Sequence, residues 1–218
     1  GVTIDETIPF DPRSDGGGYD RSKAEATLEV MKGIEQGLDG LIVCPTGVIG
    51  PFDFRRSEMG RLILDCMEKK VQLTVDGAYD FVDVRDVANG LVLARDKGRS
   101  GEAYILSGEQ IQLPLLMRMV QDITGIRSVL LKIPSGLAKM AAGISPIYYR
   151  MTRQKPLFTR YSIETVLSNS VISSRKARLE LGYTARSIRE SVGDSVSWFK
   201  LDHLLTGLNR FTHRSPSL

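Results

Sequence analysis

Tyr19 and Lys23 are the residues of this chain whose types and spacing best suit proton transfer. They stand at the start of a helical pattern, and side chains four residues apart on a helix lie on the same face. The Lys23 ammonium would stabilise the phenolate form of Tyr19 and so help the phenol to exchange a proton with a hydroxyl or carbonyl group. Tyrosine and lysine are common residues, so the pair needs support from the surrounding sequence.

Helical and extended patterns alternate along the chain, which favours an α/β fold with a largely parallel sheet. Asp83 is expected to cap the helix that follows it, while Gly125 and Gly182 are expected to end two others. Parallel sheets bind ligands at the carboxyl ends of their strands, so segment 45–51 is a candidate binding site. Apolar residues at helical spacing predict helices within 24–37, 59–67, 84–92, 113–123, 175–181 and 188–199. Short apolar runs predict strands at 41–44, 71–75, 104–106, 129–133 and 171–173.

The composition of the 218-residue chain is typical of a soluble globular protein, with 42% hydrophobic and 25% charged residues. The net charge of +3 is small and the basic residues are scattered, so we expect neither a nucleic-acid nor a membrane partner. Cys44 and Cys66 lie in apolar segments without metal-ligand spacing, which favours reduced thiols in a cytoplasmic protein and no metal site. No apolar run reaches the ~18 residues needed to span a bilayer.

Three ordered segments add to the signal from Tyr19 and Lys23. They are Gly18-Tyr19-Asp20-Arg21-Ser22-Lys23-Ala24-Glu25, Cys44-Pro45-Thr46-Gly47-Val48-Ile49-Gly50-Pro51 and Asp80-Phe81-Val82-Asp83-Val84-Arg85-Asp86-Val87-Ala88. In this order and at these spacings they resemble the extended short-chain dehydrogenase/reductase family, also called the NAD-dependent epimerase/dehydratase family. Segments 45–51, 53–55 and 157–162 look most like its dihydroflavonol reductase-like branch, and the resemblance covers nearly the whole chain.

The resemblance implies NADP or NAD as the cofactor and a role for each matching residue. Tyr19 would be the catalytic acid and base, and Lys23 would bind the nicotinamide ribose and assist Tyr19. The cofactor would contact Tyr19, Lys23, Pro45, Thr46, Gly47 and Val48, the last four largely through backbone groups. The substrate would contact Cys44, Phe54 and Tyr79. Asp83 and Asp86 would serve to pack and cap their helix at least as readily as to bind a ligand.

The chain departs from the family pattern in its phosphate-binding glycines. It contains neither G-x-G-x-x-G nor G-x-x-G-x-x-G, a turn that would hold the cofactor pyrophosphate at a helix N-terminus. We therefore expect the C-terminal part of a Rossmann-like enzyme whose N-terminal βαβ cofactor half is missing. The expected divisions are 1–56 and 83–110 in the Rossmann-like part, 57–82 and mainly 111–206 in a smaller α+β substrate lobe, and 207–218 as a disordered tail.

These patterns leave three functions open. The first is an NAD(P)-dependent oxidoreductase that transfers hydride to or from a small-molecule ketone or alcohol. The second is a nucleotide-sugar epimerase or dehydratase, but such enzymes commonly have asparagine at the position of Cys44 and arginine at that of Tyr79. The third is a non-catalytic, truncated or atypical family member that acts as a binding module. An exposed sheet edge would then allow a homodimer or the recruitment of a partner.

Overall fold

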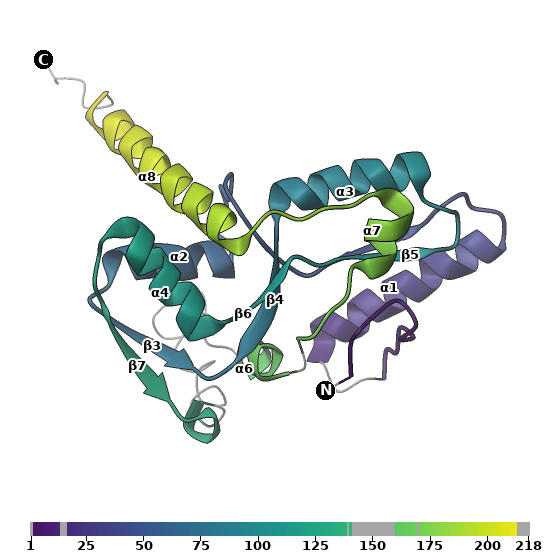
Figure 1. Cartoon of the computed structure of the whole chain (residues 1–218), viewed down its shortest axis with the longest axis horizontal. Helices are drawn as coiled ribbons and strands as arrows, with labels where there is room; N and C mark the ends of the chain where they lie inside the picture. Colours follow the sequence, from purple (N-terminus) through teal and green to yellow (C-terminus); the bar gives the residue numbers. More distant parts are fainter. Residues whose placement is uncertain (1, 14–16, 139, 141–159, 169, 213–218) are drawn as a thin grey trace, which may run out of the picture.

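The computed structural model describes residues 2–13, 17–138, 140, 160–168 and 170–212, and Figure 1 shows their arrangement. The helices considered below are α1 (Gly17–Glu35), α2 (Glu58–Glu68), α3 (Val84–Lys97), α4 (Leu113–Thr124), α6 (Arg160–Leu167), α7 (Arg175–Leu181) and α8 (Ile188–Thr212). The strands are β1 (Ile42–Pro45), β2 (Gly47–Ile49), β3 (Val71–Val75), β4 (Ala78–Asp83), β5 (Ala103–Leu106), β6 (Glu109–Gln112) and β7 (Val129–Ile133). Helices that alternate with mostly parallel strand pairs confirm the predicted α/β class.

One layer of the molecule is built on the parallel pair β1 and β5, whose register places Ile42 opposite Ala103. In Figure 1, α3 and α7 lie on one side of this pair and α1 lies on the other. A core between the strands and α3 and α7 consists of Val82, Ala94, Tyr104, Leu106, Ala177, Leu181 and Tyr183. By contrast, α1 has no fully buried residue, so the helix that bears Tyr19 and Lys23 lies at the surface.

Strand β4 joins this layer to the rest of the molecule. It pairs in parallel with β2, where Phe81 stands opposite Gly47, and antiparallel with β6. Successive side chains of a strand point to opposite faces, and Phe81 and Val82 accordingly belong to two different cores. The hydrophobic pattern missed β2 because it has only three residues, and it missed β4 and β6 because polar residues such as Asp80 and Gln110 interrupt them.

The second part of the molecule, called here the β3–β7 lobe, consists of β3, β7, α2, α4 and the first half of α8. The two strands are parallel, and their register runs from Val71 opposite Val129 to Val75 opposite Ile133. Residues of α8 at helical spacing are buried against α2 and α4, namely Ile188, Val192, Val196 and Phe199. This confirms the amphipathic pattern that predicted the last helix.

Local signals for element ends agree well with the structure. Strands β3 and β7 have the predicted bounds. Asp83 caps α3 by accepting a hydrogen bond from the Arg85 backbone N–H at 2.8 Å. Gly125 and Gly182 end α4 and α7 in the left-handed conformation, with φ of 73° and 75°. Glycine is favoured there because it has no Cβ to oppose a positive φ.

One predicted strand differs from the structure. Segment 171–173 is not a strand but forms an isolated parallel bridge between Ile172 and Ile4, since only one pair of residues meets. Helix α8 extends past Gly207 to Thr212, and helix α7 packs on α3 and β5. The expected divisions of the chain stay a prediction. Segments 157–159 and 213–218 lie outside the described residues.

Candidate functional site

The first turns of α1 present the predicted acid–base pair to solvent. Tyr19 is the third residue of the helix and is 61% exposed, and Lys23 is exposed one turn later. The Lys23 Nζ lies 5.7 Å from the centroid of the Tyr19 ring, within reach of a cation–π interaction. Ser22 Oγ donates a hydrogen bond to the Tyr19 carbonyl oxygen at 2.8 Å within this turn. The phenol and the ammonium therefore lie on one face of α1.

Tyr79 of β4 is electrostatically coupled to the start of α1. Burial raises the pKa of Tyr79, and the charges of Asp20, Asp80 and Tyr19 raise it further. The Tyr79 ring meets Phe81 edge-on, with centroids 5.6 Å apart and an interplanar angle of 66°. Gly47 lies against both rings, and a Cβ there would come within 2.8 Å of atoms in each. Glycine is thus required at this position for the two aromatic rings to pack.

The segment after β1 contains most of the other predicted contacts. Cys44 and Pro45 end β1, Thr46 forms the link, and Val48 lies in the middle of β2. Pro45 and Val48 are exposed, whereas Cys44 is half-buried. Burial raises the pKa of the Cys44 thiol, with a further contribution from the Glu6 carboxylate, so the thiol is neutral at physiological pH. The segment turns the chain from the β1–β5 pair into the β2–β4–β6 sheet.

Asp80 is a buried carboxylate to which the sequence analysis assigned no role of its own. Thr46 Oγ1 donates to Asp80 Oδ1 at 2.6 Å, and the Gly108 backbone N–H donates to the same oxygen at 3.0 Å. Burial raises the pKa of Asp80 despite these two hydrogen bonds, which act to lower it. The carboxylate thereby joins the link after β1 to the turn between β5 and β6. The sequence contained a signal for this buried carboxylate, because Asp80 is an acidic residue within a segment, Tyr79 to Val82, that is otherwise aromatic and aliphatic.

Phe54, a predicted substrate contact, lies against α8. Its ring meets Trp198 edge-on, with centroids 5.2 Å apart and an interplanar angle of 86°. The loop that bears it contains two residues other than glycine with positive φ, Phe52 at 71° and Arg56 at 51°. Such conformations are costly and persist where the surrounding structure imposes them. The position of this loop is set by α8, and a substrate role for Phe54 stays a prediction.

Asp83 and Asp86 form ion pairs in the structure. Asp83 Oδ2 pairs with Arg85 Nη2 at 2.8 Å, and Arg85 also reaches Asp194 of α8 at 2.7 Å. Asp86 accepts hydrogen bonds from Arg186 Nε at 3.1 Å and Nη2 at 2.9 Å. The partners lie on α3, on α8 and in the link before α8. Both carboxylates therefore cap and pack the helix, which is one of the two roles that the sequence analysis allowed them.

The exposed donors at the start of α1 suit part of a nicotinamide nucleotide. The Lys23 ammonium provides N–H donors for ribose hydroxyls, and the Tyr19 phenol provides one O–H donor for a carbonyl oxygen. Within the part of the chain that the structure describes, no three histidine, cysteine or acidic side chains are grouped so that they could hold a metal ion. None of the described helices is long and apolar enough to cross a membrane.

The parallel strand pairs and the helices that alternate with them define a Rossmann-like α/β protein. The sequence model of the NAD dependent epimerase/dehydratase family matches residues 2–107. The chain belongs to this family and is thus a member of the extended short-chain dehydrogenases/reductases, as its motifs predict.

Three similar proteins span most of the chain. Sterol demethylase protein B from Methylococcus capsulatus is 37% identical over 194 residues, which are 88% of this chain and 58% of the relative. A provisionally named dihydroflavonol 4-reductase from Synechocystis sp. is 29% identical over 188 residues, 84% of this chain and 55% of the relative. The crystal structure of gox2253 matches with a TM-score of 0.77 at 36% identity, over 93% of this chain and 62% of that one. The chain thus spans less than two thirds of each protein.

Proposed function

We propose that the protein is an NAD(P)-dependent oxidoreductase that transfers hydride between nicotinamide and a ketone or alcohol. The observation that supports this most directly is the position of the Lys23 Nζ, 5.7 Å from the centroid of the exposed Tyr19 ring. The family supports the nicotinamide cofactor through its description as NAD dependent. The name of the Synechocystis relative, a 4-reductase, supports reduction of a carbonyl group.

Tyr19 moves the proton in this proposal. During reduction, the Tyr19 O–H donates its proton to the carbonyl oxygen, and during oxidation the phenolate takes a proton from the hydroxyl group. Lys23 stabilises the phenolate by its charge and donates hydrogen bonds to the ribose of the nucleotide. The cofactor, when bound, supplies or accepts the hydride. The exposure of both side chains leaves room for the two ligands beside α1.

The segment from Pro45 to Val48 would face the nicotinamide mainly through its backbone. This part of the proposal is supported by the Thr46 hydroxyl, which already donates its hydrogen to Asp80. It is supported as well by Gly47, where the rings of Tyr79 and Phe81 exclude any side chain. Cofactor contacts here would therefore go to N–H and C=O groups.

A ketone or alcohol suits the surroundings better than a nucleotide sugar does. The raised pKa of Tyr79, caused by burial and then by Asp20, keeps the phenol neutral at physiological pH. The half-buried Cys44 thiol is neutral for a similar reason. Neither group can supply the positive charge that would stabilise a diphosphate. These two positions favour a substrate of low charge.

The test combines turnover with binding of the cofactor. Nicotinamide absorbance would follow ketone reduction by the wild-type protein and by Tyr19→Phe, which keeps the ring but removes the proton donor. We expect turnover to fall at least about a hundredfold, the usual scale for loss of a general acid. NADH and NADPH fluorescence titrations would compare Lys23→Ala with Lys32→Ala, an exposed lysine on the same helix that pairs with Glu29.

We expect Lys23→Ala to weaken dinucleotide binding and Lys32→Ala to leave it unchanged. Retained turnover in Tyr19→Phe would remove Tyr19 from the mechanism. Equal effects of the two lysine substitutions would show that Lys23 acts only through the general charge of α1. Thermal stabilisation by a UDP-sugar or GDP-sugar, without turnover of any ketone, would support the epimerase alternative instead.

A further inference from the structure

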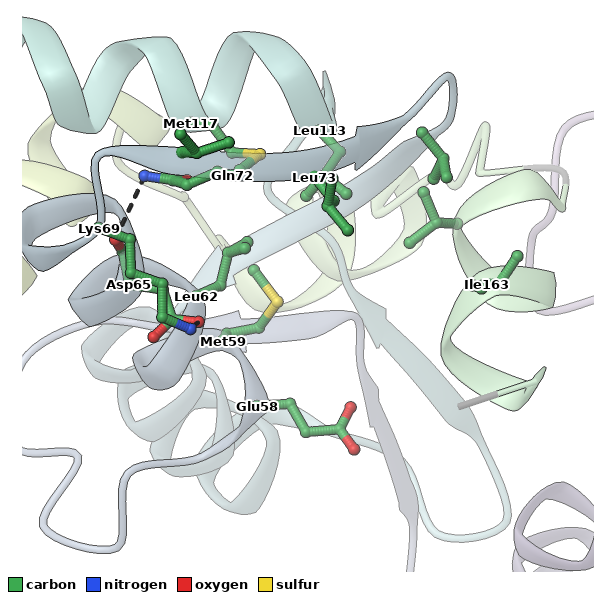
Figure 2. Close-up of a pocket in the computed structure, with 13 residues that line it drawn as sticks. Glu58, Met59, Leu62, Asp65, Lys69, Gln72, Leu73, Leu113, Met117 and Ile163 are labelled. Atoms are coloured by element: carbon green, nitrogen blue, oxygen red, sulfur yellow. Dashed lines mark hydrogen bonds and ion pairs between the residues drawn. The ribbon is translucent and has the colours of Figure 1, made fainter. Parts of the chain in front are cut away.

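A cavity of about 320 Å³ lies between α2, β3, α4 and α6 (Figure 2). These elements lie on the side of the molecule away from α3 (Figure 1). Apolar side chains from four elements form its walls, among them Leu62, Leu73, Met117 and Ile163. Protein interiors contain few voids larger than a water molecule, whereas small-molecule sites begin at about 300 Å³. The volume is therefore that of a small-ligand site rather than that of a packing defect.

Three polar side chains at the wall, Gln72, Asp65 and Lys69, already have partners within the protein, whereas Glu58 is exposed to solvent. Gln72 Nε2 donates to the Asp65 carbonyl oxygen at 3.2 Å and to Ser128 Oγ at 3.0 Å, and its Oε1 accepts from Cys66 Sγ at 3.0 Å. The Asp65 carboxylate forms an ion pair with Lys69 at 2.6 Å. These groups would have to give up existing hydrogen bonds to bind a polar ligand, which disfavours such a ligand.

The charges around the cavity disfavour an anion. Glu58 and Asp65 contribute two carboxylates, and Lys69 contributes one ammonium. The resulting excess of one negative charge repels phosphates and carboxylates, and no side chain of the wall offers an unpaired positive charge. The size of the cavity, the existing partners of Gln72, Asp65 and Lys69, and the excess negative charge all disfavour an anionic or strongly polar ligand.

We propose that this cavity binds a neutral apolar molecule, such as a hydrocarbon ring system or a short alkyl chain. Burial of the ligand against the aliphatic and thioether walls would provide the binding energy, because it removes apolar surface from water. This inference does not depend on the proposed reduction, because none of the residues that line the cavity takes part in proton transfer.

Leu73 and its cross-strand neighbour provide a matched pair of variants. Leu73 of β3 and Leu131 of β7 are Cα partners on the same face of the strand pair, 45% and 49% exposed, and Leu73 lines the cavity whereas Leu131 does not. Leu73→Trp would fill the cavity, while Leu131→Trp would place the same ring on the neighbouring strand. The probe would be 2-naphthol, which is neutral at pH 7, titrated into the chain by calorimetry, with anionic 2-naphthoate as the charged analogue of similar size.

We expect wild-type protein to bind 2-naphthol at least about tenfold more tightly than Leu73→Trp does, and Leu131→Trp to stay within about twofold of wild type. We also expect 2-naphthoate to bind at least about tenfold more weakly than 2-naphthol. Absence of 2-naphthol binding by the wild-type chain, equal loss in both variants, or equal binding of the two probes would overturn the proposal. If circular dichroism shows that Leu73→Trp does not fold, Val71→Trp and Val129→Trp form a second matched pair, because Val71 lines the cavity and its partner Val129 does not.

Discussion

Gly47 shows how a single residue determines the packing of two aromatic rings, those of Tyr79 and Phe81, in the candidate site. Its missing side chain lets the rings of Tyr79 and Phe81 pack against the backbone of β2. The pKa of Tyr79 is raised by burial and further by Asp20, Asp80 and Tyr19, so the ring is electrostatically coupled to the start of α1. A change at Gly47 should therefore affect the packing of β2 on β4.

We predict that Gly47→Ala destabilises the protein by about 1–3 kcal/mol, the usual cost of overpacking a well-filled site. The added Cβ would lie 2.8 Å from carbon atoms of both rings, which cannot both move away. Gly193→Ala in α8 is the control, because its Cβ meets no atom within 4 Å and alanine favours the helix by about 0.5–1 kcal/mol. Urea unfolding would measure both variants, and equal stability of the two would contradict the packing argument.

Strand β4 places two carboxylates three residues apart in opposite environments. Asp80 is held by two neutral donors, the Thr46 hydroxyl and the Gly108 N–H, and burial raises its pKa. Burial of Asp83 acts to raise its pKa, but the hydrogen bonds from Arg85 and Ser191 together with the Arg85 charge lower it overall. The contrast depends on whether charged or neutral donors surround each carboxylate.

We predict opposite pH dependence for Asp80→Asn and Asp83→Asn. The stabilising contribution of Asp80 is largest below its unfolded pKa of ~3.9 and declines as pH rises through its higher folded pKa. The free energy of unfolding of Asp80→Asn should therefore rise relative to that of wild type above about pH 4. Asp83 contributes stability above its unfolded pKa of ~3.9, and this contribution is lost as pH falls through its lower folded pKa. The loss of unfolding free energy caused by Asp83→Asn should therefore become smaller below about pH 4. Urea unfolding across pH would give both difference curves, and slopes of the same sign would refute the assignment.

Two of the three hydrophobic cores among the described residues meet at β4. Phe81 packs in the core of the β3–β7 lobe together with Phe199, and Val82 packs in the β1–β5 core together with Leu181. Because adjacent residues of one strand are buried in both cores, neither core can lose its packing without disturbing the other. We therefore expect the described part of the chain to unfold as one unit.

We predict that Phe199→Ala lowers the free energy of unfolding by about 3–5 kcal/mol and Leu181→Ala by about 2–5 kcal/mol. Each substitution should lower the midpoint temperature of a single unfolding transition. Trp198, the only tryptophan of the sequence, reports on the β3–β7 lobe, whereas circular dichroism reports on all helices. The two melting curves of Leu181→Ala should coincide, and a tryptophan transition left at the wild-type temperature would show two independent units. Leu179→Ala, at a 73% exposed position of α7, should change stability by less than about 0.5 kcal/mol.

The sequence by itself determined the features that depend on local spacing. The α/β class, the bounds of β3 and β7, the Asp83 cap and the glycine ends of α4 and α7 follow from period and capping rules that act over a few residues. The placement of Tyr19 and Lys23 on one face of α1 is local for the same reason. The motifs that identified the family are likewise continuous segments.

Only the tertiary structure decided which distant segments meet. Thr46 and Asp80 are 34 residues apart in sequence, and their 2.6 Å hydrogen bond could not be inferred from either segment alone. The contact of Phe54 with Trp198 and the cavity between α2, β3, α4 and α6 have the same origin. The short strands β2, β4 and β6 exist because they pair with one another, and pairing depends on neighbours that no local pattern specifies.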